Sequence, residues 1–421
     1  MRVLMLSWEY PPKSVGGLAQ HVYDLTSAMA RQGVEVHLIT CAAAGAPRYE
    51  TVNGVNVYRV HPYQVSTPDF PTWVLQFNIA MLEEVIPLTR RYGAFDIIHA
   101  HDWLVAYAVR ALKHALTAPL IATIHATEFG RNNGLHNQLQ NYISNVEWWL
   151  TYEAWRVIVC SRYMEGEIKY VFQTPADKIA VINNGVDPAN FAHRSQRVNR
   201  DFYAAPNEKI VFYVGRLVPE KGVQVLIRAM PNILAHCPAT KFVIAGKGPY
   251  EQELRSLAAH LGLQNRVYFT GYINDEVRNA LYHWAEAAVF PSLYEPFGIV
   301  ALEAMAARTP VVVSDTGGLS EIVEHGVTGL KAYTGDANSL AHNIIHLLTN
   351  PSLAKMIQER AFRMVQTQYD WNTIARQTVD VYRQVDRERR NRDWKAAQER
   401  QGRILERVQH LIKRSEVGGQ R

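Results

Sequence analysis

Cysteine is scarce in this chain, and long apolar segments are absent. Three cysteines occur among 421 residues, at Cys41, Cys160 and Cys237, and none lies at the short spacing of a metal-binding cluster. The sequence therefore predicts neither disulfides nor a structural metal site. It favours a reducing compartment, which we expect to be the cytoplasm. No apolar run reaches the length that a membrane-spanning helix requires.

An excess of positive charge is confined to the C-terminal end. Residues 387–421 contain eleven Lys or Arg and five Asp or Glu, a net +6, so the formal charge of +5 leaves −1 for the rest of the chain. The body of the protein therefore lacks the basic character that attracts nucleic acids. Apolar residues recur at helical spacing within 387–421, which predicts a basic amphipathic tail. Such a tail could contact the inner face of an anionic membrane, or it could self-associate. Its apolar positions are Trp394, Ala397, Ile404, Leu405, Val408, Leu411 and Ile412.

Apolar runs of strand length alternate with helical stretches along most of the chain. The first residues indicate a strand at 3–6, a helix at 18–31 and a strand at 34–40, which is the pattern of a parallel sheet with helices on both faces. A similar series begins at 210–214, and a chain of 421 residues is too long for one core. We therefore predict an α/β fold of two doubly wound, Rossmann-like domains. They are expected at residues 1–190 and 207–370, with a further helix at 371–386.

The most informative stretch joins an apolar strand, 287–290, to a helix that starts near Ile299. A helix N-terminus exposes unpaired N–H groups and the positive end of the helix dipole, so the amides of Gly298 and Ile299 suit a phosphate. Glu295 and Glu303 lie on either side of this point, where each could accept hydrogen bonds from sugar hydroxyls. This arrangement fits a nucleotide sugar, with ribose at Glu303, diphosphate at Gly298 and the donor sugar at Glu295. An ordinary helix start with two surface acids is the alternative.

Two further loops at predicted strand ends carry groups that suit a phosphate. Gly16 and Gly17 precede a helix and let the backbone approach a ligand closely, and Lys13 adds charge. Arg216 and Lys221 bracket the second loop, where a planar guanidinium and a compact ammonium together can hold a diphosphate. Two surface cations are the weaker interpretation of that pair.

A third loop, 246–248, has Glu251 where a dinucleotide-binding Rossmann loop would have its third glycine, and it does not follow the first strand of its domain. We therefore reject a nicotinamide or flavin dehydrogenase. Gly248 is still expected near the donor, and the loop with Tyr272 and Ile273 could lie against a nucleobase.

Polar residues also follow two strands of the first domain, at the sheet edge where open α/β sheets bind ligands. His99, His101, Asp102 and His125 invite interpretation as a metal site. Alternation along the strand puts the first two histidines on one side, but it need not bring Asp102 to them, and we expect no metal there. His125 could equally be a core histidine bonded to a backbone carbonyl.

Four segments together carry a family resemblance. They are Lys-Ser-Val-Gly-Gly-Leu at 13–18, Asn-Gly-Val-Asp at 184–187, Gly-Arg-Leu-x-x-x-Lys-Gly at 215–222 and Glu-Pro-Phe-Gly-x-x-x-x-Glu at 295–303. They resemble motifs of the retaining nucleotide-sugar glycosyltransferases of family 4 and of the related glycogen and starch synthases. The resemblance covers residues 1–385. It implies two Rossmann-like domains facing each other across a cleft, the GT-B architecture, with the C-terminal helix crossing back onto the first domain.

The resemblance also implies roles for residues. His125 would stabilise the donor sugar and Glu295 would orient it, while Arg216 and Lys221 would stabilise the leaving diphosphate, so these four are the expected catalytic groups. The expected donor-binding residues are Lys13, Gly16, Gly17, Asn184, Gly248, Tyr272, Ile273, Phe297, Gly298, Ile299 and Glu303.

Glu9 and Asp102 are expected on the acceptor side, within the runs Trp-Glu-Tyr-Pro-Pro and His-Asp-Trp that resemble glycogen-synthase-like members. Gln20 departs from the glycogen synthases, which carry Asp there. The implied reaction is retaining transfer of a hexosyl group, with glucose from UDP- or ADP-glucose favoured, to a hydroxyl of a sugar, glucan or glycolipid. No Asp-x-Asp occurs in the sequence, so we expect no obligatory metal and no other cofactor.

Other functions remain open on the sequence alone. A mannosyltransferase using GDP-mannose fits the same motifs, and a nucleotide-sugar epimerase fits the same scaffold. A phosphorylase of related fold would carry a pyridoxal phosphate lysine, for which we see no matching site. A catalytically silent sugar-binding module would not need the cations and acids named above.

Overall fold

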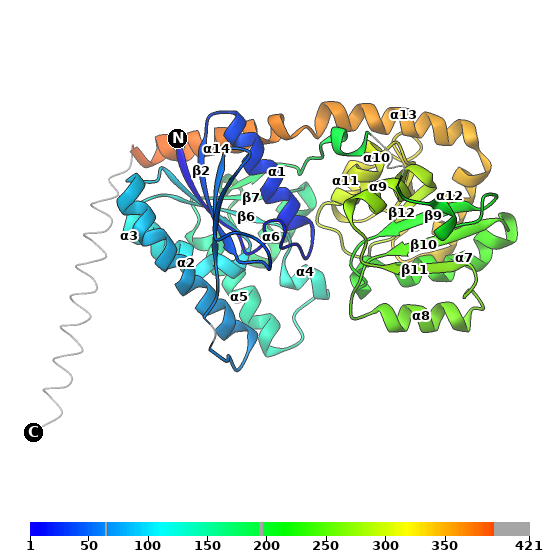
Figure 1. The fold of residues 1–421 in the computed structure, drawn as a ribbon, viewed down its shortest axis with the longest axis horizontal. Coiled ribbons are helices and arrows are strands. Elements are labelled where there is room, and N and C mark those ends of the chain that lie inside the picture. The colour runs from blue at the N-terminus through cyan, green and yellow to red at the C-terminus, as the bar shows by residue number, and fades with distance from the viewer. Residues whose placement is uncertain (64, 193–196, 391–421) are drawn as a thin grey trace, which may run out of the picture.

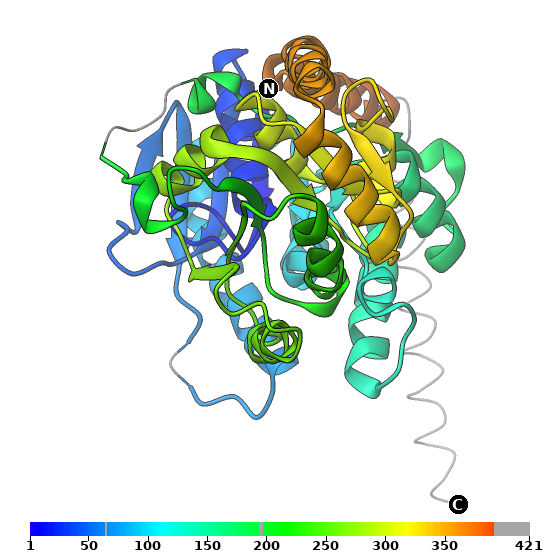
Figure 2. The ribbon, with the colours of Figure 1, turned by 90° about the vertical axis from the view of Figure 1, so that its right-hand side faces the viewer.

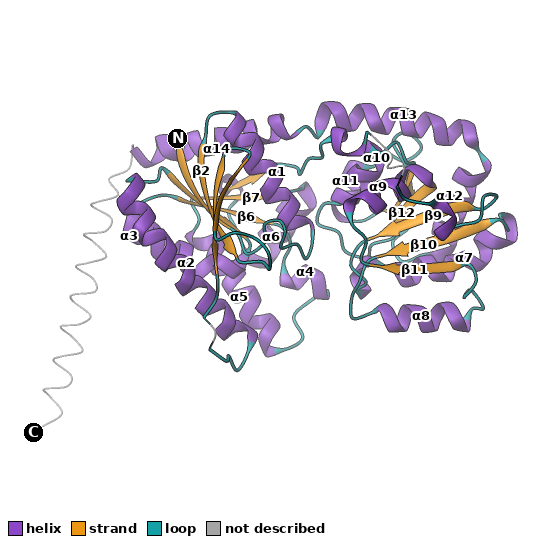
Figure 3. Cartoon of the chain, in the orientation of Figure 1, coloured by secondary structure: helices purple, strands orange, loops and turns teal. Residues whose placement is uncertain are grey.

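The structure is a computed structural model that describes residues 1–63, 65–192 and 197–390. The chain forms two α/β lobes side by side, each with a sheet at its centre and helices around it (Figures 1 and 3). Most of the tail expected at 387–421, with all of its apolar positions, lies outside the described residues. None of the helices within the described ranges combines the length and apolarity needed to cross a membrane.

The first lobe is built on an eight-stranded sheet in the order β3-β4-β2-β1-β5-β6-β7-β8. All neighbouring pairs are parallel except β3 and β4. The inner strands are short, apolar and buried on both faces, as expected of a parallel sheet covered by helices. The strands are β1 (Arg2–Leu6), β2 (Glu35–Cys41), β3 (Tyr49–Val52), β4 (Val55–Val60), β5 (Ile97–His101), β6 (Leu120–Ile124), β7 (Arg156–Val159) and β8 (Ile179–Val181).

The edge hairpin β3–β4 is an element that our sequence prediction did not include. Its two-residue turn is Asn53-Gly54, and both residues have positive φ, 50° and 83°. Those angles belong to the turn whose twist matches a right-handed hairpin, and Asn-Gly is its preferred sequence. The turn signal was therefore present in the sequence.

The described part of the first lobe, up to residue 192, contains six α-helices. Most begin at a residue whose side chain caps the first turn, as Asp69 does for α2 and Ser161 for α6. The helices are α1 (Gly17–Arg31), α2 (Phe70–Tyr92), α3 (Ala106–Leu116), α4 (Glu128–Asn132), α5 (Gln138–Glu153) and α6 (Arg162–Phe172).

The second lobe has a six-stranded parallel sheet in the order β11-β10-β9-β12-β13-β14. The strands are β9 (Lys209–Val214), β10 (Thr240–Ala245), β11 (Val267–Gly271), β12 (Ala285–Phe290), β13 (Val311–Ser314) and β14 (Leu330–Ala332). The helices are α7 (Val223–His236), α8 (Glu251–His260), α9 (Asp275–Trp284), α10 (Ile299–Ala306), α11 (Gly317–Ile322), α12 (Ala337–Thr349) and α13 (Pro351–Gln368).

The last described helix, α14 (Trp371–Arg390), leaves the second lobe and packs on the first (Figures 1 and 2). Its buried face, including Trp371 and Tyr382, shares one core with Val22 of α1 and the strands of the first sheet. The helix extends to Arg390, beyond the predicted end at residue 386. Glu388 explains the extension, because its carboxylate accepts a hydrogen bond from the Trp155 indole at 2.7 Å.

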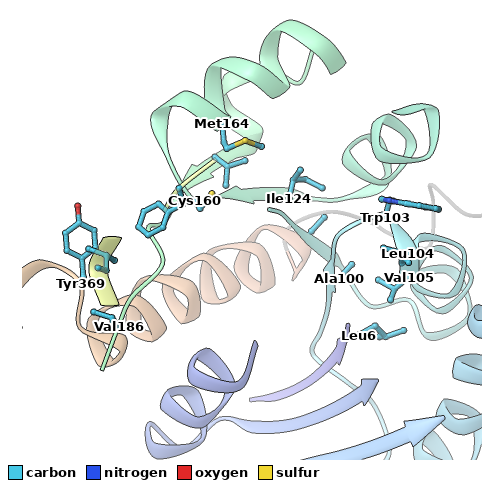
Figure 4. Packing of buried hydrophobic residues seen from close by; sticks show 14 of the residues in the cluster. Leu6, Ala100, Trp103, Leu104, Val105, Ile124, Cys160, Met164, Val186 and Tyr369 are labelled. Carbon is cyan, nitrogen blue, oxygen red and sulfur yellow. The ribbon is translucent and has the colours of Figure 1, made fainter. Parts of the chain in front are cut away.

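A second core cluster runs through the contact between the lobes. In Figure 4, Leu6, Ala100 and Ile124 lie on neighbouring strands of the first sheet, and Cys160 and Met164 lie nearby. The same cluster includes buried residues of the second lobe such as Phe297. The two sheets are therefore held together by apolar packing, close to the loops that carry the predicted site.

Candidate active site

The loop between β12 and α10 is held in place by glycines from neighbouring loops. A side chain at Gly222 would lie 1.8 Å from the carbonyl oxygen of Pro291, and one at Gly317 would lie 2.0 Å from that of Glu295. Gly298 has φ +112° and forms the N-cap of α10, as the sequence pattern indicated. The backbone that would face a phosphate is therefore fixed by close backbone contacts on two sides.

Glu295 and Lys221 form an ion pair across this loop. The Lys221 ammonium lies 2.8 Å from Oε2 of Glu295, which also accepts a hydrogen bond from Ser292 at 3.1 Å. Both charged groups are largely buried, so each orients the other. Arg216 differs, because its side chain is 44% exposed and lies 3.6 Å from Glu220.

Glu303 is buried at the other end of the loop, on α10. Tyr282 donates a hydrogen bond to its Oε2 at 3.1 Å, and the Arg278 guanidinium lies 3.6 Å from its Oε1. Burial raises the pKa of Glu303, and Arg278 opposes the shift. Sequence reasoning missed both partners, although they lie one turn apart on the same face of α9.

The start of α1 in the first lobe lies directly opposite the start of α10. A side chain at Gly17 would lie 3.1 Å from Cδ1 of Ile299, so the structure brings these two predicted donor residues together. Glu9, which the sequence predicts on the acceptor side, accepts hydrogen bonds from the amides of Val15 and Gly16 at 2.7 and 3.2 Å. The amide of Gly16, which we expected to face a phosphate, therefore already donates a hydrogen bond to this carboxylate.

Asp102 is the other residue that the sequence predicts on the acceptor side. It is buried at the end of β5, and its Oδ1 accepts a hydrogen bond from the backbone N–H of His125 at 2.8 Å. Burial raises the pKa of Asp102 to about 6, while the positive charge of Arg131 acts against this shift. Asp102 has a positive φ of 58°, which is uncommon for a residue with a side chain. It therefore holds the backbone of His125 in place.

Three histidines meet where α1, β5 and β6 converge. Nδ1 of His101 lies 3.1 Å from Nε2 of His125, and one ligand atom from each of His21, His101 and His125 lies within 4.8 Å of the others. Burial, and then the charge of Arg131, lowers the pKa of His125 to about 3, so its imidazole is neutral. Neutral imidazoles at this spacing could hold a transition metal. Two of the nitrogens, however, already bond to each other.

The ring of His99 packs 4.4 Å from that of His101, but its two nitrogens bond to Tyr382 at 2.5 Å and to Thr123 at 2.7 Å. It is a structural histidine of the core between β5 and α14. Of the four residues named from the sequence, His101 and His125 thus join His21, whereas the polar atoms of His99 and Asp102 bond to other partners.

The burial of His21 predicts a specific pH dependence of stability. Burial holds the pKa of His21 well below the ordinary 6.5, so the folded chain binds fewer protons there than the unfolded chain as pH falls. Its contribution to stability is complete above pH 6.5 and is lost on acidification. Between about pH 6.5 and pH 5, we expect the wild type to lose more stability than His21→Gln. Denaturant unfolding at both pH values measures this, with exposed His260→Gln as the control. Equal losses in wild type and His21→Gln would contradict it.

The other predicted donor residues differ in how far they can reach a ligand. Asn184 is buried beside His21, and its interaction raises the pKa of that histidine against the larger effect of burial. Gly248 lies so close to Leu217 that a side chain there would come within 2.1 Å of a carbonyl oxygen. Tyr272 is 75% exposed, as a surface against a nucleobase would be.

Three of the remaining predicted residues are engaged within the protein or only partly accessible. The side chain of Phe297 is buried in the core, with its ring 6.2 Å from that of Tyr369, so only its backbone could meet a donor. Ile273 is half-buried and packs against the core. Lys13 lies with its ammonium 5.3 Å from the ring centre of Trp8.

Comparison with known proteins places this geometry in a family. The family model of glycosyl transferases group 1 matches residues 195–364, and that of glycosyltransferase family 4 matches residues 15–190. An uncharacterised glycosyltransferase of Methanocaldococcus jannaschii is 41% identical over 91% of this chain and 98% of its own length. A glycogen synthase of Mycobacterium tuberculosis is 37% identical over 91% of this chain and 94% of its own.

Comparison of the fold with solved structures supports the same family. The sucrose-phosphate synthase of Thermosynechococcus elongatus superposes with a TM-score of 0.80 at 27% identity, covering 91% of this chain and 99% of that one. Two Rossmann-like lobes with this connectivity are the GT-B fold that the sequence motifs implied. By its sequence, its fold and the loops between its lobes, the chain belongs to the family 4 glycosyltransferases.

Proposed function

We propose that the protein is a retaining hexosyltransferase that moves glucose from UDP-glucose or ADP-glucose to a hydroxyl acceptor. One observation carries this proposal. The buried Lys221–Glu295 pair and the buried Glu303 lie at the two ends of a rigid loop whose centre is the N-terminus of α10. That loop has acceptors for two sugar rings and a positive centre for the diphosphate between them.

In this proposal the departing diphosphate is the charge that develops during the reaction. Lys221, Arg216 and the first amides of α10 stabilise it, and the departing phosphate takes the acceptor proton on the same face of the sugar. His125 meets the donor sugar as a neutral imidazole. Glu295 orients that sugar and does not act as a nucleophile, so the two carboxylates are not a glycosidase pair.

The glucosyl donor is favoured by the named relatives, a glycogen synthase and a structurally similar sucrose-phosphate synthase. The acceptor is a sugar, a glucan or a glycolipid. Glycogen synthases carry Asp at the position of Gln20, and this difference counts against a glucan acceptor. Here the Gln20 side chain donates a hydrogen bond to Asp24 at 2.8 Å. A mannosyltransferase using GDP-mannose is the second candidate, since none of the contacts above selects the sugar or the base.

A nucleotide-release assay tests the proposal. The full chain is incubated with UDP-glucose, ADP-glucose or GDP-mannose, each with and without maltooligosaccharides and simple sugar acceptors. We expect acceptor-dependent release of UDP or ADP. Release of GDP alone would favour the mannosyltransferase. An altered donor sugar without acceptor would indicate an epimerase, and no turnover with any donor would leave a binding module.

Catalysis is expected to proceed without an obligatory metal. In this proposal Arg216, Lys221 and backbone amides hold the diphosphate, and they supply positive charge without a divalent ion. The release rate in excess EDTA should therefore equal the rate with added Mg²⁺. Strict dependence on a divalent ion would contradict this mechanism.

A further inference from the structure

The side chain of Tyr294 belongs to the second lobe but is buried in the first. It precedes Glu295 in the loop between β12 and α10, which we call the donor loop, and it is 7% exposed. Its hydroxyl donates a hydrogen bond to Oε1 of Glu167 on α6 at 2.8 Å and accepts one from the backbone N–H of Thr127 at 3.4 Å. A side chain at Gly130 would lie 2.4 Å from its ring, so only glycine leaves room for the ring there.

The same carboxylate also binds the loop that carries His125. The hydroxyl of Thr127 donates to Oε1 of Glu167 at 2.6 Å and accepts from the N–H of Gly130 at 2.9 Å. Thr127 is two residues after His125, and Tyr294 is next to Glu295. One oxygen of Glu167 therefore ties together the two loops that hold the proposed donor-sugar residues.

Two other contacts join the second lobe to the start of α6. The carboxylate of Glu321 accepts hydrogen bonds from the backbone N–H groups of Arg162 and Tyr163 at 3.0 and 2.7 Å. A carboxylate at a helix N-terminus is favourable because the amides there lack partners within the helix. The hydroxyl of Ser161 donates to the carbonyl of Pro296 at 2.6 Å. The start of α6 thus contacts both the loop between β12 and α10 and the helix α11 of the second lobe.

We propose that Tyr294 is a positioning residue that sets the distance between Glu295 and His125 by docking into the socket formed by Thr127, Gly130 and Glu167. The proposal rests on the glycosyl transfer proposed above. It follows from the geometry, because the socket is the direct hydrogen-bonded link between the two loops. A displacement of the reacting groups by about 1 Å can lower the rate on the order of a hundredfold. A docking residue can therefore control turnover without touching substrate.

Tyr294→Phe is the sharpest variant, because it removes only the hydroxyl and keeps the ring in the socket. We expect kcat to fall roughly ten- to a hundredfold, with the dissociation constant for the nucleotide unchanged within about twofold. Gly130→Ala should displace the ring and lower kcat at least as much. Tyr170→Phe, at an exposed tyrosine on α6, is the matched control and should behave as wild type. A kcat of Tyr294→Phe equal to that of wild type would overturn the proposal.

Hydrogen exchange supplies a readout that needs no turnover. The amides of Arg162 and Tyr163 are covered by Glu321 only when the lobes are docked, so undocking should raise their exchange. We expect faster exchange there in Tyr294→Phe and Gly130→Ala, and unchanged exchange in Tyr170→Phe. Unchanged exchange in all three would overturn the docking role even if the enzyme is active. Failure of the wild type to turn over any donor would instead overturn the proposed function, while the exchange result would still decide the docking.

Discussion

Lys221→Ala is expected to lower kcat about a hundredfold. The Lys221 ammonium lies in a largely buried position, 2.8 Å from Glu295 and beside the loop that would hold the diphosphate. A cation placed in advance at a developing negative charge contributes on the order of 3 kcal/mol to transition-state stabilisation. The steady-state rate of nucleotide release at saturating donor measures the loss.

Removal of Lys221 also leaves the Glu295 carboxylate without its partner, and that effect has to be separated from catalysis. The double variant Lys221→Ala/Glu295→Gln removes both charges, so it tests whether the unpaired carboxylate causes the loss of rate. We expect the double variant to remain at least as slow as Lys221→Ala, because both groups act on the donor. Lys355→Ala, at an exposed lysine on α13, controls for a general change of charge. Recovery of wild-type rate in the double variant would contradict a direct role for Lys221.

Glu303→Ala is expected to weaken nucleotide binding by about 2 kcal/mol, roughly thirtyfold, because two ribose hydroxyls would lose a charged hydrogen-bond acceptor. Glu303 is oriented for this role by Tyr282 and Arg278, which fix its two oxygens within the second lobe. Isothermal titration with UDP, ADP and GDP measures the loss.

Glu295→Ala is the matched control, since it removes the other carboxylate of the same loop. It should spare nucleotide affinity and reduce the discrimination between donor sugars. Tyr282→Phe should show a smaller loss than Glu303→Ala, because it only releases one hydrogen bond to the carboxylate. Equal affinity for nucleotide in wild type and Glu303→Ala would exclude the ribose role.

The sheets and the donor loop were accessible from the sequence because their signals are local. Predominantly apolar runs such as 121–124 and 287–290 lie within buried parallel strands, and the glycine and proline pattern after β12 ends a strand and starts a helix within a few residues. The residues that the structure pairs as Lys221–Glu295 were both named in advance. Their contact was not, because it joins positions 74 residues apart in sequence.

The partners and orientations of individual site residues depend on burial and on contacts between the lobes, which a single sequence does not display. Glu9 and Asp102 were predicted on the acceptor side from motifs alone, and the structure adds that each carboxylate accepts hydrogen bonds from backbone N–H groups. A buried carboxylate needs such partners, and the spacing of residues cannot reveal where they lie. Tyr294 lies inside the recognised motif, but its partner Glu167 belongs to the other lobe. The sequence did not predict the histidine group, because it joins residues of β5 and the end of β6 to His21, which comes from α1.

The most direct test of the central claim is a proton NMR time course of UDP-α-glucose or ADP-α-glucose with a maltooligosaccharide or another hydroxyl acceptor in the presence of the full chain. The account predicts that the anomeric signal of the donor disappears as an α-glucosidic signal appears on the acceptor, together with free nucleoside diphosphate, and that the rate falls about a hundredfold in Lys221→Ala. A β-linked product, free glucose as the sole sugar product, or conversion of the donor sugar without release of nucleotide would contradict it.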